Sequence, residues 1–189
     1  MVANIRSGPS PSGALYYNKE KVDKDEAEVL FWQKMLEPFD KHGRMDVDAC
    51  MESFLPYLEA NRRTKNPVFH ASLNPAPEDR LTNDELRQIA REYMERMGYG
   101  AQPCFVFLHE DIERRHIHIV SLRVGLDGRK LAHDFEARRS REILDALERR
   151  YGLRPAAEGD AKQTYDTLSK LDYTKSDLKR QIASLVRST

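Results

Sequence analysis

The feature that most constrains the fold is a pair of short apolar segments with a brief, mostly polar connection between them. They cover residues 104–109 and 115–124 and are rich in aromatic and β-branched side chains. Segments of this length and composition are typical of strands, and a connection of five residues favours an antiparallel hairpin. Side chains alternate along a strand, so His116 and His118 share one face of the second segment while two isoleucines occupy the other.

The rest of the chain switches between helical and strand-like periodicity. The expected elements, in chain order, are a strand at 2–6, helix in one or two pieces at 14–36, a helix at 47–61, a strand at 67–73, a helix at 83–97, the hairpin, and a helix at 134–151. Thr82 and Glu85 form a capping box before the third of these helices, and Gly98 ends it. We expect Asp134 to cap the last helix.

Antiparallel strands combined with long helices predict a fold of the α+β class. We expect a central antiparallel sheet that carries the histidines and is covered by helices, followed by a helical C-terminal part. A chain of 189 residues suits one core of ordinary size. We place the main domain at residues 1–152 and a helical extension at residues 153–189.

Composition excludes several classes of protein. Lysine and arginine total 31 and aspartate and glutamate total 31, so binding to nucleic acid through bulk charge is excluded, although local basic clusters remain. The chain has no apolar stretch long enough for a membrane span and no apolar core of a secretory signal near residue 1. Its two cysteines are too few for a disulfide framework, so we expect a cytoplasmic protein.

The histidines of the hairpin form the strongest candidate site. His109 ends the first strand, and a hairpin would bring its ring beside His116 and His118. Three neutral imidazoles that converge in this way are typical of a metal site with open positions. Asp111 and Glu110 lie close enough in sequence to hold an imidazole N–H. The alternative to a metal site is that His116 and His118 are a half-buried polar pair that binds no metal.

Tyr16 and Tyr17 are the other candidates for chemistry. A phenol with a pKa near 10 is a poor nucleophile at neutral pH unless a cation or a base activates it. A divalent ion could do so by polarising the phosphate that the phenol attacks. The two side chains project about 100° apart on a helix, so we expect only one to face a metal. Simple packing of both rings is the alternative.

The order of these motifs resembles that of the conjugative relaxases, the mobilisation nucleases of plasmids and integrated elements. The resemblance rests on the pattern His-x-Asp-x4-His-x-His, which begins at His109. It also rests on Gly13-x-x-x-Tyr17-Asn18, on the segment FHASLNP at 69–75, and on LTNDEL at 81–86. It covers roughly residues 1–130 and is nearest to the mobilisation proteins of Bacteroides-type elements.

The resemblance implies a metal-dependent enzyme of the HUH endonuclease superfamily that nicks and rejoins single-stranded DNA at a transfer origin. His109, His116 and His118 would bind Mg²⁺ or Mn²⁺, although a purified sample could carry Zn²⁺ or Ni²⁺. Tyr17, with Tyr16 as the second candidate, would attack the scissile phosphate and become joined to the DNA 5′ end. Asp111 would orient a histidine or accept a proton. Residues 1–152 would form the catalytic domain, and accessory mobilisation proteins would be partners.

The resemblance also implies which residues contact DNA. His70, Ser72 and Asn74 share the polar face of their strand and match a second motif of the family. Many relatives carry an asparagine four residues after the last histidine, where this chain has Leu122, and Ser121 or Arg123 could replace it. Arg114 and Arg115 are local cations that, with Arg62, Arg63, Arg138 and Arg139, could line one groove for phosphates.

Three alternatives to a relaxase stay open. A replication initiator or transposase would share the chemistry, but its tyrosine would follow the histidines, as Tyr151, Tyr165 and Tyr173 do here. A metal-dependent hydrolase would use water and form no covalent adduct with DNA. A non-catalytic metal or DNA-binding module would tolerate the loss of both early tyrosines.

Overall fold

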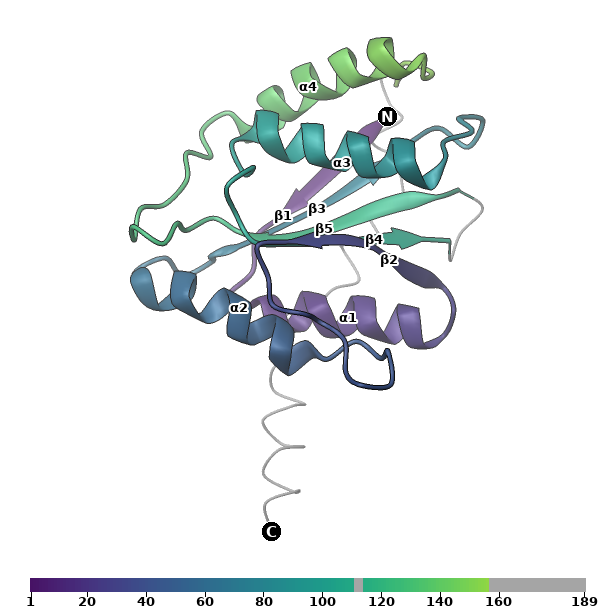
Figure 1. Ribbon diagram of the computed structural model, residues 1–189. Helices are drawn as coiled ribbons and strands as arrows, with labels where there is room; N and C mark the ends of the chain where they lie inside the picture. Colours follow the sequence, from purple (N-terminus) through teal and green to yellow (C-terminus); the bar gives the residue numbers. More distant parts are fainter. Residues whose placement is uncertain (111–113, 157–189) are drawn as a thin grey trace.

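The computed structural model describes residues 1–110 and 114–156. Within them the chain forms three layers, with α1 and α2 on one face of a sheet and α3 and α4 on the other (Figure 1). The elements are β1 (Val2–Arg6), α1 (Pro11–Asp23), β2 (Ala27–Gln33), α2 (Val47–Ala60), β3 (Val68–Asn74), α3 (Asn83–Met97), β4 (Cys104–His109), β5 (His116–Leu122) and α4 (Glu136–Tyr151). The expected α+β class and the antiparallel sheet are confirmed.

The sheet has the strand order β1-β3-β5-β4-β2, and every neighbouring pair is antiparallel. β4 and β5 form the predicted hairpin, in which His109 pairs with His116. β3 lies on the other side of β5, with Ser72 opposite His118. The three central strands are fully buried, because helices cover both faces.

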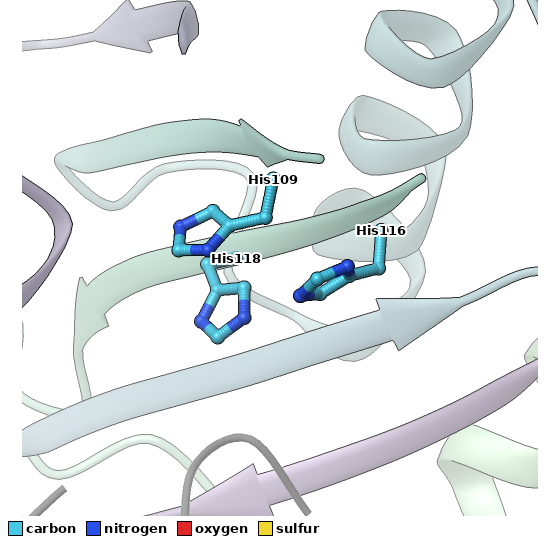
Figure 2. Close-up of side chains that lie close together, drawn as sticks. All are labelled: His109, His116 and His118. Carbon is cyan, nitrogen blue, oxygen red and sulfur yellow. The ribbon is translucent and has the colours of Figure 1, made fainter. Parts of the chain in front are cut away.

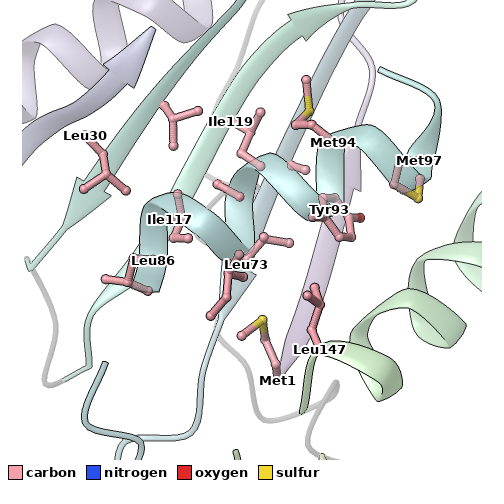
Figure 3. Packing of buried hydrophobic residues seen from close by; sticks show 14 of the residues in the cluster. Met1, Leu30, Leu73, Leu86, Tyr93, Met94, Met97, Ile117, Ile119 and Leu147 are labelled. Carbon is pink, nitrogen blue, oxygen red and sulfur yellow. The ribbon is translucent and has the colours of Figure 1, made fainter. Parts of the chain in front are cut away.

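Alternation along the strands divides the interior into two cores. Leu73, Ile117 and Ile119 point toward α3 and α4, where they pack with residues such as Tyr93 and Leu147 (Figure 3). The other face carries a second cluster, in which Phe105, Phe107, Val120 and Leu122 pack against α1 and α2. Because side chains two residues apart share a face, the histidines of β4 and β5 lie on this second face, beneath α1.

The helix α3 begins and ends at the predicted residues. The Thr82 side chain accepts a hydrogen bond from Glu85 N, and the Glu85 side chain accepts one from Thr82 N, which completes the capping box. Gly98 closes the helix in the left-handed conformation, with φ of 88°. The whole of α3 is therefore specified by signals within its own sequence.

The structure corrects the expectation of helix across residues 14–36. The helix α1 ends at Asp23, Asp25 turns the chain with φ of 56°, and β2 follows at the sheet edge against β4. A bulge between Val29 and Phe31 interrupts the alternation of this strand. Pairing with β4 and burial of the apolar side chains Leu30 and Phe31 outweigh the helical propensity of the segment.

A second correction concerns the start of α4. Phe135, and not Asp134, occupies the N-cap position, in the left-handed conformation and without a side-chain capping bond. Gly152 ends the helix as expected. The predicted helical extension falls largely on residues 157–189, which lie outside the described residues. Among the described helices, none has the length and apolar character that a membrane span needs.

Candidate metal centre and its tyrosine

The three histidines predicted from the sequence meet at one point on the sheet. His109 is the last residue of β4, His116 is the first of β5, and His118 follows two positions later on the same face. One ring nitrogen from each lies within 4.8 Å of those of the other two, and all three side chains are buried (Figure 2). The hairpin register creates this convergence, because it places His109 directly opposite His116.

The electrostatics of the cluster suit a bound cation. Burial lowers the pKa of His118 well below its usual value, and the nearby His109, His70 and His116 lower it further. The ring is therefore neutral at physiological pH and offers a lone pair rather than a positive charge. Three imidazole ligands would leave open coordination positions for a substrate oxygen or water. Such a donor set fits a divalent metal ion.

Each ring is oriented by a partner outside the cluster. His109 Nε2 lies 2.7 Å from Asn18 Oδ1, and Asn18 Nδ2 donates to Ala14 O at 2.7 Å, so the amide oxygen accepts the imidazole proton. His116 Nδ1 donates to the carbonyl oxygen of Arg114 at 3.3 Å. In the resulting tautomers the lone pairs are on His109 Nδ1 and His116 Nε2, which are the nitrogens that would face an ion.

His70 supports the cluster from β3. Its Nε2 lies 3.2 Å from His118 Nδ1, and the two rings are tilted at 60°. Burial lowers the pKa of His70 to about 3, so this ring is also neutral and can share a single proton with His118. His70 thereby fixes the orientation of His118 without joining the set of three that could hold a metal.

The helix α1 lays one of the two adjacent tyrosines over the histidines. The Tyr17 ring centroid lies 6.0 Å from that of His109, with the planes 20° apart, and 6.1 Å from that of His118. Tyr16 instead packs against the second apolar core. The two side chains thus diverge as the helical geometry requires, and Tyr17 is the one that faces the cluster.

Two residues that the sequence interpretation left without a role also belong to this site. Asn18 is fully buried and holds His109, as described above. Lys21 follows Tyr17 by one helical turn, pairs with Glu26 at 2.6 Å, and adds positive potential near His118. The signal for Lys21 was its spacing from Tyr17, since residues four positions apart lie on the same face of a helix, whereas periodicity gave no such signal for Asn18.

The candidate DNA-contacting residues of β3 have partners within the protein. Ser72 and Asn74 lie on the same face as His70 and are buried. Asn74 Nδ2 donates to Ser72 Oγ at 3.1 Å and to the Val2 carbonyl oxygen at 3.2 Å. The bond to Val2 ties β1 to β3 beside the histidines, and the bond to Ser72 holds the Asn74 amide in place.

The candidate arginines are spread over several surroundings, and no described hollow is lined by all of them. Arg115 donates to Glu110 and to the Leu81 carbonyl oxygen, so Glu110 holds an arginine and not an imidazole. Arg123 is buried and paired with Glu136 at 2.6 Å. Arg114 borders a hollow near Asn74, whereas Arg63 borders a different hollow. The predicted catalytic residue Asp111 lies outside the described residues.

A comparison with protein families finds a match over most of the chain. The family model described as "Relaxase: MobA/VirD2-like, nuclease domain" matches residues 17–153, which include Tyr17 and every histidine of the cluster. A search of curated proteins finds no significant match.

Proposed function

Because the chain belongs to the MobA/VirD2-like relaxase nuclease family, we propose that it nicks and rejoins one strand of DNA at a transfer origin through a 5′-phosphotyrosine intermediate. The observation that carries this proposal is the position of Tyr17 above three buried histidines. The reaction would mobilise a plasmid or an integrated element, of the Bacteroides type that the motif order resembles. Accessory mobilisation proteins and a cytoplasmic location are part of the same proposal.

His109, His116 and His118 would hold a divalent metal ion. When bound, the ion would supply Lewis-acid polarisation of the scissile phosphate. Mg²⁺ or Mn²⁺ is the proposed working ion, because both are compatible with phosphate oxygens as further ligands. Three imidazoles have higher affinity for Zn²⁺ or Ni²⁺, so a purified sample could carry one of these. Asn18 and His70 would keep the rings in the orientation that the ion needs.

Tyr17 would be the nucleophile. Its Oη would bond to phosphorus while the bond from phosphorus to the 3′ oxygen breaks, and the phenolic proton would leave to a base as the 3′ oxygen gains a proton. Lys21, one turn along α1, would favour the phenolate by its charge. Asp111 remains the predicted proton acceptor or orienting group. Rejoining reverses the step, because the phosphotyrosine bond conserves the energy of the phosphodiester.

The position of Tyr151 supports an early nucleophile over a late one. It lies on α4, which covers the opposite face of the sheet from the histidines, and its Oη donates to Gln88. The other late tyrosines, Tyr165 and Tyr173, lie outside the described residues. A tyrosine that precedes the histidines in the chain is the arrangement expected of a relaxase rather than of a replication initiator.

The test is a covalent adduct with DNA. Single-stranded oligonucleotides that span a candidate transfer origin are incubated with Mn²⁺ and resolved by denaturing electrophoresis. We expect an adduct with the wild type and with Tyr16→Phe, the matched control, and none with Tyr17→Phe or His116→Ala. Cleavage without an adduct would indicate a hydrolase that uses water. An adduct that persists in Tyr17→Phe would overturn the assignment of the nucleophile.

A further inference from the structure

A basic cleft lies at the end of the sheet away from the His109–His116 pair. It is a hollow of about 500 Å³ between the α2–β3 connection and the β5–α4 connection. Its cationic lining residues are Arg63, Lys65, Arg123 and Lys130, and His133 also lines it. No acidic side chain is among the described residues that line it. These two connections lie at the same edge of the molecule in Figure 1.

The cleft is held in shape by bonds within one wall and by a bond between its two walls. Asn61 Oδ1 accepts from the backbone N–H groups of Arg63 and Thr64, both at 3.0 Å, which fixes the turn after α2. Asn61 Nδ2 donates to the Gly128 carbonyl oxygen of the opposite wall at 2.9 Å. Gly128 also lies so close to the end of α2 that a Cβ there would come within 2.7 Å of the Ala60 carbonyl oxygen.

The cationic side chains of the cleft differ in how accessible they are to a ligand. Arg123 is buried, and Glu136 neutralises it through two hydrogen bonds of 2.6 and 2.9 Å. Arg63, Lys65 and Lys130 are exposed, and Lys130 Nζ lies 3.3 Å from His133 Nε2. A preformed hollow with several exposed cations is suited to phosphate groups, because it concentrates positive potential in one place.

An exposed aromatic residue lies close to the cleft in the sequence. Phe135 follows His133 by two residues, and 80% of its surface is accessible, the highest value among the large apolar side chains described. Its φ of 52° is a conformation that phenylalanine adopts at a cost. Burial does not explain this residue, whereas an exposed aromatic ring is a side chain on which bases of single-stranded nucleic acid stack.

We propose that the basic cleft binds phosphates of the single-stranded DNA substrate at a distance from the nick, with Phe135 stacking on a base. The inference rests on the proposed function and extends it to a second contact region. Strand β1 connects the two regions along the chain: Arg6 pairs with His70, and the next residue, Ser7, lines the cleft. From His118 to Arg123, the residue that follows β5, the backbone spans about 17 Å at 3.3 Å per residue, and the Arg123 side chain packs against Phe69 and Tyr99 on the other face of the sheet. A stacked strand covers that distance with about five nucleotides.

The salt dependence of DNA binding tests the phosphate contacts. The probe is a fluorescein-labelled oligo(dT) of 20 nucleotides, with the affinity measured by anisotropy between 50 and 300 mM NaCl without divalent metal. Each phosphate contact to single-stranded DNA contributes about 0.7 to the slope of log K against log[salt]. We expect the double variant Arg63→Gln/Lys130→Gln to lower the slope by about 1.4. The matched control, Lys41→Gln/Arg149→Gln, removes two exposed cations elsewhere and should leave it unchanged.

Phe135 gives an independent readout. Phe135→Ala should weaken oligo(dT) binding at least about fivefold without changing the salt slope, and Phe135→Trp should restore it. The inference would be overturned if the cleft variant had the same salt slope as the control and Phe135→Ala bound oligo(dT) as tightly as the wild type. A wild type that forms the tyrosine adduct while the cleft variants bind normally refutes only the cleft. A wild type without adduct but with cleft-dependent slopes refutes only the proposed reaction.

Discussion

Asn18→Ala tests whether the amide under α1 positions a metal ligand. The substitution removes the acceptor for His109 Nε2 and the donor to Ala14 O, both fully buried. The second bond is worth about 1 kcal/mol, and a buried N–H that loses its acceptor costs about 1–3 kcal/mol. The free energy of unfolding of the metal-free protein should therefore fall by about 2–4 kcal/mol, as measured by urea denaturation.

The same substitution should weaken metal binding. Loss of a partner that orients a ligating histidine costs about 10- to 100-fold in affinity. Isothermal titration with Mn²⁺ should show this loss for Asn18→Ala and not for Asn18→Asp, because aspartate still accepts the proton of His109 Nε2.

A stability control separates positioning from general weakening. Thr82→Ala removes the capping box of α3, on the opposite face of the sheet, and should cost about 1 kcal/mol of unfolding free energy with no change in Mn²⁺ affinity. If Asn18→Ala bound Mn²⁺ within twofold of the wild type, the positioning role of Asn18 would be refuted, whatever happened to stability.

Three further outcomes follow from local geometry. Gly128→Ala should cost about 2 kcal/mol in urea denaturation, because φ of 73° and a carbonyl oxygen at 2.7 Å oppose a Cβ. Glu136→Ala should cost about 3 kcal/mol by the same assay, since it leaves the buried Arg123 charge without its carboxylate; a loss below 1 kcal/mol would mean that solvent reaches the guanidinium. Burial raises the pKa of Cys50 and Cys104 to about 12, so at pH 8 neither thiol should react with a disulfide reagent until the protein is unfolded, and reaction in the native state would contradict the described burial.

The parts of the fold that could be predicted from the sequence are those with local signals. Alternation in the hairpin and the capping box at Thr82 both act within a few residues, so they specify structure wherever the segment lies. The edge strand β2 has no such signal. The turn before it depends on Asp25 at positive φ, a conformation that aspartate tolerates, so no glycine marks the turn in the sequence. The bulge after Val29 then interrupts the alternation that would indicate a strand.

The candidate site divides in the same way. Strand alternation brings His116 and His118 together, and helical geometry requires Tyr16 and Tyr17 to diverge. The contact between Asn18 and His109 joins residues 91 positions apart, and the bond from Asn61 to Gly128 joins residues 67 positions apart. No periodicity encodes such pairs, because they arise only when helices dock on the sheet. Sequence spacing therefore predicted the histidine cluster but not the groups that hold it or the basic cleft.

The hairpin that carries all three histidines has a consequence for folding. The cluster spans ten residues, so a short loop closure assembles it at little entropic cost. Tyr17 reaches the cluster only after α1 docks across the sheet, a contact of high sequence separation that forms slowly. The three histidines are thus brought together by a local segment, and the Tyr17 phenol joins them later in folding. Pulse-labelling hydrogen exchange during refolding should accordingly show the β4–β5 hairpin protected before α1.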